Sequence, residues 1–251
     1  MVKKYRTPFL KEVIVRLDYS YPITQLTKTL PDKLKTMLAL LFPISEPKEF
    51  VGRELVISMD VTKEKFVEGT TWIFHSMDRQ KTLLIDRENV NISYKTFDSF
   101  DVLKQDFLPI VEVLFESYKD FQGKRLGLRY INEIKLDENN VLDWSEYLDE
   151  KLLTCLEFPE DPSLICRAFN NLELNYGDFI LRFQYGIHNS DYPARIQKKS
   201  FILDYDAYYQ GLQNLEDITQ NLDKFNEAIH KIFEQSIRDS LRSKMGVENN
   251  G

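Results

Sequence analysis

The sequence predicts an α+β protein made of two similar modules, each with a strand, a helix, several antiparallel strands and a second helix. Groups of segments alternate apolar and polar residues, which is typical of half-buried strands. Segments with apolar residues three and four positions apart, typical of helices, flank each group. The same order occurs twice, over residues 1–121 and 122–251. We therefore predict an internal duplication within one compact unit.

The first module begins with an alternating strand over 12–19, followed by a helix that starts near Pro31 and ends before Pro43. Proline suits the first turn of a helix and cannot continue one. Further alternating segments follow at 53–61, 71–77, 82–85 and 90–94. Short polar stretches between the last three predict hairpin turns and an antiparallel meander. A helix over 101–118 closes the module, with a kink or break predicted at Pro109.

The second module begins with a long strand over 124–136. Asp143 followed by Glu146 fits a capping box, so we expect a helix that starts there and continues past residue 156. Strands are then predicted at 164–174, 179–187 and 201–207. The last helix, predicted from about 214 to 243, would be on the order of 45 Å long.

This order of elements is similar to that in the two halves of TATA-box-binding proteins. Their modules form a saddle, with helices on one face of the sheet and the other face open. The similarity implies a pseudo-twofold, saddle-like sheet with helices on one face. It concerns the order of elements alone, and a fold does not carry a function with it.

Several stretches together resemble a sporadically distributed prokaryotic family of conserved hypothetical proteins of similar length. They are Pro8–Ile14, Trp72–Ser76, Tyr94 ahead of a Ser-Phe helix start, Arg125–Asn132, Leu203–Asp206, and Ile229–His230 with Ile232–Glu234. The strand Arg-Leu-Gly-Leu-Arg-Tyr-Ile-Asn at 125–132 is the most specific of them. The resemblance covers nearly the whole chain and implies a prokaryotic, cytoplasmic origin. It transfers no catalytic residue, cofactor or substrate.

Composition limits the class of protein further. With 43% hydrophobic residues over 251 positions, the chain can bury a core, which excludes intrinsic disorder. A net charge of −7 counts against binding to nucleic acid or anionic lipid. No apolar run approaches the ~20 residues that cross a bilayer. The two cysteines lack metal-ligand spacing, so we expect free thiols in the cytoplasm.

The polar faces of the second-module strands carry the candidate ligand-binding site. Its residues are Arg125, Arg129, Glu133, Arg182, His188, Asp204 and Asp206. The arginines would bind a carboxylate or phosphate of a protein partner or a small anionic ligand, and the acids would hold them in position. The simpler interpretation, which we favoured, is a solvated face of cross-strand ion pairs worth ~0.2–1 kcal/mol each.

Two alternatives belong to other functional classes. Asp204 and Asp206 would lie about 7 Å apart on one strand face, where a divalent metal could bridge them in a hydrolase or nuclease, helped by Glu133 and His188. Nucleic-acid binding by a saddle-like sheet would use a basic strip that includes Lys135 with the three arginines. Hydrolase, kinase and dinucleotide-binding motifs are absent from the sequence, so no catalytic residue or cofactor is predicted. A binding or regulatory role is therefore favoured over catalysis.

For the remaining candidate residues we predict structural roles and not functional ones. His75 and His230 lie beside apolar residues, and Asn132 lies on an apolar strand face, where its amide needs a hydrogen-bond partner. The 3-4 spacing of the last helix fits a core helix and, equally, a helix that pairs with a second copy in a homodimer.

Overall fold

The computed structural model describes residues 5–57 and 62–246 of the chain. It divides into two compact units made of discontinuous segments. Unit 1 contains the described residues 5–13, 127–209 and 220–246, and unit 2 contains 14–57, 62–126 and 210–219. The fold class is α+β with antiparallel strands, as the alternation predicted.

The strands and helices have definite bounds. Strands β1 (Leu10–Tyr19), β7 (Gly123–Leu136) and β10 (Lys199–Gln213) and helix α4 (Leu215–Ser236) contribute residues to both units. Unit 2 also contains β2 (Ile44–Ser45), β3 (Lys48–Ile57), β4 (Thr62–His75), β5 (Lys81–Ile85), β6 (Asn89–Tyr94), α1 (Asp32–Leu41) and α2 (Phe100–Ser117). Unit 1 also contains α3 (Thr154–Glu157), β8 (Ala168–Asn175), β9 (Ile180–Ile187) and α5 (Asp239–Met245). Three short 3-10 helices lie at Thr24–Thr27, Glu150–Leu152 and Pro162–Leu164.

The first and last strands of each unit are neighbours. In unit 2 the order is β2-β4-β5-β6-β1, with β3 paired to β4, and in unit 1 it is β7-β10-β9-β8. Unit 2 thus has two strands, β2 and β3, more than unit 1. The duplication of 1–121 and 122–251 stays a prediction.

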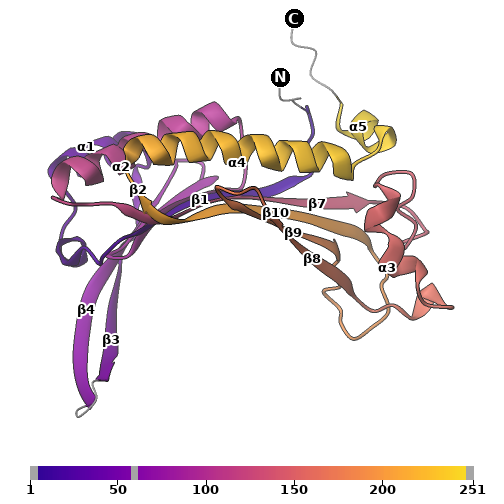
Figure 1. Ribbon diagram of the computed structural model, residues 1–251, viewed down its shortest axis with the longest axis horizontal. Coiled ribbons are helices and arrows are strands. Elements are labelled where there is room, and N and C mark those ends of the chain that lie inside the picture. Colours follow the sequence, from indigo (N-terminus) through magenta and orange to yellow (C-terminus); the bar gives the residue numbers. More distant parts are fainter. Residues whose placement is uncertain (1–4, 58–61, 247–251) are drawn as a thin grey trace, which may run out of the picture. The chain divides into compact units, whose positions relative to one another are not determined.

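Helix α4 lies along one face of the unit 1 strands (Figure 1). The contacts are specific, because Tyr130 of β7 donates a hydrogen bond to Asn226 Oδ1 at 2.9 Å and Tyr205 of β10 donates one to Ser236 Oγ at 3.1 Å. The ring of Phe179 lies 5.0 Å from that of Phe225. The opposite face of these strands is left uncovered by α4.

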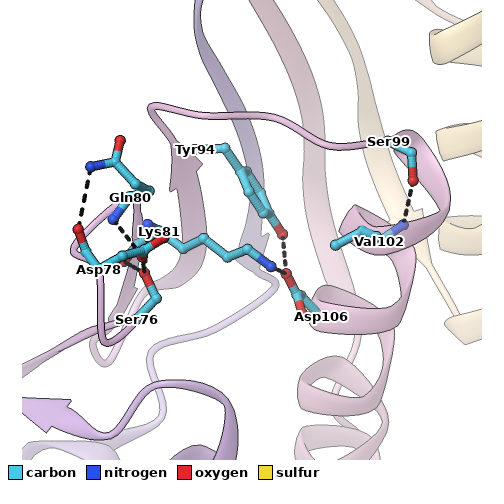
Figure 2. Close-up of polar contacts among 8 residues, drawn as sticks. All are labelled: Ser76, Asp78, Gln80, Lys81, Tyr94, Ser99, Val102 and Asp106. Carbon is cyan, nitrogen blue, oxygen red and sulfur yellow. Dashed lines mark hydrogen bonds and ion pairs between the residues drawn. The ribbon is translucent and has the colours of Figure 1, made fainter.

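In unit 2, α2 is fastened to the strands by an ion pair. Lys81 Nζ of β5 lies 2.8 Å from Asp106 Oδ2 of α2, and Tyr94 of β6 donates a hydrogen bond to the same oxygen at 3.2 Å. Figure 2 shows Lys81 and Tyr94 pointing toward Asp106. The helix begins at a Ser99 cap, whose hydroxyl accepts a bond from the Val102 amide. It continues through Pro109 to Ser117, so proline does not end it.

The β3–β4 hairpin extends from the rest of unit 2 (Figure 1). Its base is fixed by Trp72, whose indole N–H donates to the Leu26 carbonyl at 2.7 Å. Phe50 packs over Gly69, where a Cβ would lie only 2.9 Å from the ring. The predicted strand over 53–61 partly falls outside the described residues, and β4 begins nine residues before the predicted strand at 71.

Two helix predictions in unit 1 are wrong for one reason. Residues 143–149 are not helical and contain a turn over 145–147, and the helical segments that follow are short, at Glu150–Leu152 and Thr154–Glu157. Asp143 accepts bonds from the amide and hydroxyl of Ser145. The last helix breaks after Ser236, and α5 starts at Asp239. The cause is a backbone bridge between Leu148 and Ile237, flanked by bonds that join residues 147–149 to 236–238. These tertiary bonds replace the helical ones that the local patterns favour.

The predicted strand start at 164 is also wrong, because Pro162–Leu164 forms a 3-10 helix.

Candidate functional site on the open face of unit 1

The side of the unit 1 strands that α4 leaves uncovered is called here the open face. It is formed by Arg129, Ile131 and Glu133 of β7; Ser200, Ile202, Asp204 and Asp206 of β10; Arg182 and Gln184 of β9; and Phe169, Asn171 and Glu173 of β8. Strand alternation places them there, because their neighbours Leu128, Tyr130, Leu203 and Tyr205 are buried on the other side. Five of the seven predicted site residues therefore lie on one surface of unit 1. Arg125 belongs to unit 2, and His188 follows the end of β9.

Arg129 and Asp204 form a two-pronged ion pair at the centre of this face. Nε of Arg129 donates to Oδ1 of Asp204 at 2.8 Å, and Nη2 donates to Oδ2 at 2.5 Å. The Asp204 side chain is only 8% exposed, whereas that of Arg129 is 40% exposed. The pKa of Arg129 is raised, first by the hydrogen bonds to Asp204 and further by the charges of Asp206 and Glu12. The nearly buried carboxylate therefore fixes the orientation of a half-exposed guanidinium.

Arg182 is held by a second acid and by an aromatic ring. Its Nε donates to Glu173 of the neighbouring strand at 2.9 Å, and its guanidinium lies 5.6 Å from the ring centre of Tyr208. In the ladder Arg182 stands opposite Asp206 on β10. Its pKa is raised chiefly by the bond to Glu173, with Asp206 adding to it. Arginines held by acids were predicted from the sequence, but Glu173 was not among the predicted acids.

The backbones of β8 and β9 approach each other closely at Gly186. Gly186 stands between Phe169 on β8 and Ile202 on β10, and it contributes no side chain between them. The residue must be glycine, because its φ is +142° and a Cβ would lie 2.1 Å from the Ala168 carbonyl oxygen. Phe169, opposite Gly186 on β8, is 44% exposed. Glycine inside a strand is typical of sites where another group approaches closely.

Glu133 and His188 line a cavity of about 620 Å³ in unit 1, together with Ser200 of the open face. Partial burial opposes ionisation of Glu133, but bonds from Lys11 at 2.9 Å and Lys135 at 3.1 Å outweigh it and lower its pKa. Lys199 pairs with Glu138 at 2.7 Å, so acids and bases in this cavity are matched. The matched charges give the cavity no preference for an anion.

Arg125 belongs to unit 2 and lines a different cavity there, with Arg16 and Lys124. The expected convergence of Arg125 with Arg129 and Arg182 in one polar strip therefore has no support from the contacts. The sequence could not separate these residues, because Arg125 and Arg129 alternate onto the same face of the same strand.

A metal centre is not built by the predicted acids. Within residues 5–57 and 62–246, no group of three or more His, Cys, Asp or Glu side chains could hold a metal ion. Asp204 is already bound by a guanidinium on both oxygens. The contacts therefore favour the arrangement of ion pairs over the hydrolase alternative.

Structural roles are predicted for Asn132, His75 and His230, and each of them contacts a neighbouring residue. Asn132 donates to the Leu203 carbonyl at 3.4 Å, so its amide meets a neighbouring backbone as expected. His75 contacts Thr82 Oγ1 at 3.0 Å and Glu46 at 3.5 Å. Burial against Tyr130 lowers the pKa of His230. Both cysteines are free thiols.

Comparisons with models of protein families and with curated proteins find no match. The resemblance to a prokaryotic family therefore stays a prediction. None of the helices formed by the described residues is both long and apolar enough to cross a membrane.

Proposed function

We propose that the protein is a cytoplasmic binding protein whose open face in unit 1 recognises an acidic segment of a partner protein. The observation that carries this proposal is the Arg129–Asp204 pair, in which a nearly buried carboxylate orients a half-exposed guanidinium. Free cysteines agree with a reducing compartment.

Arg129 retains hydrogen-bonding capacity after its pairing. A guanidinium has five N–H donors, and Asp204 takes two of them, from Nε and Nη2. The N–H groups of Nη1 and the second one of Nη2 have no other recorded partner among the described residues. An incoming carboxylate can accept two of these bonds in a plane, the geometry that favours arginine over lysine for such recognition. Because Asp204 fixes the fork beforehand, little side-chain entropy is lost on binding.

The form of the surface favours a protein segment over a small molecule. Small-molecule sites are concave. Arg129, Arg182, Asp204 and Asp206 line neither the cavity of Glu133 and His188 nor the cavity of Arg125. Phe169 is 44% exposed on the open face next to the charged row, where it offers an apolar contact to the partner. A segment that alternates apolar and acidic residues would fit both features.

The negative net charge of the chain does not prevent the open face from binding an acidic segment. Acids accompany the arginines on the open face, and the whole chain carries −7. At physiological salt, charges more than about 8 Å apart are largely screened, so the short-range fork decides the affinity. We therefore expect the partner to be selected by contacts and not by long-range attraction.

The test is a fluorescence anisotropy titration with a labelled peptide of alternating Glu and Phe. Loss of a hydrogen bond to a charged group costs ~1.5–3 kcal/mol, so Arg129→Gln should weaken binding by about 10- to 100-fold. The matched control is Arg195→Gln, which removes the same charge from an exposed residue of the same unit. Replacing Glu by Gln in the peptide should have the same effect as the Arg129 variant. Equal weakening by both protein variants, or no saturable binding, would contradict the proposal.

A further inference from the structure

Strand β8 is an edge strand of unit 1. It stands last in the strand order, so β9 is its one neighbouring strand among the described residues (Figure 1). In an antiparallel pair, the N–H and C=O groups of alternate residues point toward the neighbouring strand, and those of the residues between them point away. About half of the backbone groups of β8 therefore face outward. Within the described part of the chain, no other backbone segment bonds to them.

β8 lacks the features that usually prevent an edge strand from pairing. Proteins protect such edges with short strands, prolines, lysines, bulges or a covering segment. β8 has eight residues in an unbroken register with β9, contains neither proline nor lysine, and has no residue that is buried. Its one charged residue, Glu173, is bound by Arg182 of β9. Phe169 and Leu172 add apolar surface, because they are 44% and 45% exposed.

The two ends of this edge carry charges that complement each other. Arg167 directly precedes β8 and is exposed, with its guanidinium 4.5 Å from the ring centre of Tyr192. No carboxylate among the described residues pairs with Arg167. Glu173 lies near the other end, on the same side of the strand. Its Oε1 accepts from Arg182, and no described donor is recorded for its Oε2.

We infer that β8 pairs with β8 of a second copy of the chain, antiparallel, with the two-fold axis beside Asn170. This register sets Arg167 opposite Glu173 of the partner subunit, and symmetry forms the same ion pair a second time. It also sets Ala168 opposite the partner's Leu172, so a small and a large apolar side chain pack together. Cross-strand pairs of both kinds stabilise antiparallel strands.

Other registers lose this match. With the axis beside Asn171, Glu173 would lie opposite the partner's Phe169. With the axis beside Phe169, Arg167 would lie opposite the partner's Asn171. A symmetric dimer uses the same surface of both subunits, so the surface must complement itself. The charges at the ends of β8 meet this condition, which favours a second copy over an unrelated strand.

The dimer would have a continuous sheet with both open faces on one side, because opposite residues of an antiparallel pair point to the same face. It does not depend on what the open face binds, since Arg129 and Asp204 lie on β7 and β10, whereas the contact is made by β8.

Sedimentation velocity of the full chain tests this inference at protein concentrations up to about 0.5 mM, because short edge contacts belong to the weak class of interfaces. We expect a reversible monomer–dimer equilibrium. Arg167→Glu sets like charges opposite each other twice and should raise the Kd of the dimer about tenfold or more. The matched control is Lys231→Glu, the same charge reversal at an exposed position of α4, which should leave Kd unchanged.

A mixture of two variants separates association from folding. Glu173→Lys should also weaken the dimer, and it removes the acid that binds Arg182. When Arg167→Glu and Glu173→Lys chains are mixed in equal amounts, opposite charges face each other at both positions. The mixture should therefore form a heterodimer with a Kd near that of the wild type, a recovery that unfolded chains cannot give.

Hydrogen exchange locates the contact. The outward amides of 168–175 should exchange more slowly as the protein concentration rises, whereas those of α4 should not change. A monomer at every concentration would overturn the inference and leave the edge to a strand of another protein. Equal weakening by Arg167→Glu and Lys231→Glu, or a dimer with unprotected β8 amides, would also overturn it. Arg129→Gln should dimerise like the wild type, so failure of this contact and failure of the open face are distinguishable.

Discussion

Replacement of Asp106 by Asn should destabilise unit 2, because it leaves the charge of the Lys81 ammonium uncompensated. The Asp106 side chain is 10% exposed and that of Lys81 is 23% exposed, so both charges are largely removed from water. Asn keeps the size of the side chain and an oxygen that can accept from Tyr94. It removes the negative charge that compensates Lys81. Figure 2 shows that the side chains of Lys81 and Tyr94 converge on the Asp106 carboxylate. The substitution of Asp106 therefore acts specifically on these two contacts.

The expected loss follows from the burial of the pair. Breaking a fully buried ion pair costs ~3–5 kcal/mol, because it leaves an uncompensated charge. Lys81 retains some contact with water, so we expect a loss of about 2–3 kcal/mol for Asp106→Asn. Lys81→Met leaves the Asp106 carboxylate with the Tyr94 hydroxyl as its one recorded side-chain donor and should cost a similar amount. The double variant removes both charges and should cost less than the sum of the single losses.

Urea denaturation followed by circular dichroism measures these free energies, and a double-mutant cycle isolates the interaction between the two side chains. We expect a coupling energy of at least 1.5 kcal/mol. Lys104→Met is the control, because it removes a lysine of α2 whose ammonium lies 4.9 Å from the ring centre of Phe100. A coupling below about 0.5 kcal/mol, or an Asp106→Asn loss no larger than that of Lys104→Met, would refute the reasoning.

Three further outcomes can be measured with the same denaturation assay. Gly186→Ala should lower the free energy of unfolding by ~2–3 kcal/mol, because the added Cβ meets the Ala168 carbonyl. The control is Gly177→Ala, at φ +87° with nothing within 4 Å, which should cost ~1–2 kcal/mol of backbone strain. Equal losses would contradict the close approach at Gly186. Lys199→Met should cost about 1–3 kcal/mol because the ammonium lies over two rings and an acid, whereas Lys198→Met, 78% exposed, should change stability by less than about 0.5 kcal/mol. The folded-state pKa of Glu133 is lowered, so its contribution is present above its unfolded pKa and disappears as pH falls through the folded value. The wild type should therefore lose more stability than Glu133→Gln between about pH 5 and 3, and parallel curves would show that the ion pairs contribute nothing.

Local sequence patterns specify much of this fold. Alternation along β7 identifies which residues face α4, and the same pattern in β10 places Asp204 on the side of Arg129. Hairpin turns around Arg79 and Asn175 were also found from the sequence, because turn residues act locally. The sequence therefore predicts which face of each of these strands is buried.

What the sequence could not specify depends on contacts between distant segments. The bridge from Leu148 to Ile237 ends two predicted helices, and nothing within either segment signals it. Likewise Glu173 reaches Arg182 because β8 neighbours β9, which alternation alone does not determine. The candidate site was consequently predicted as one cluster, whereas the contacts divide it between the open face, the Glu133 cavity and the Arg125 cavity.

Mapping of the acidic peptide by two-dimensional NMR of the labelled protein tests the central claim most directly. If the open face of unit 1 is the binding surface, the backbone amides of Arg129, Arg182 and Gly186 should shift in proportion to the bound fraction. The amides of Lys124 and Arg125 should stay unchanged under the same conditions. Shifts confined to Lys124 and Arg125, or scattered over the lysines of both units, would contradict the account.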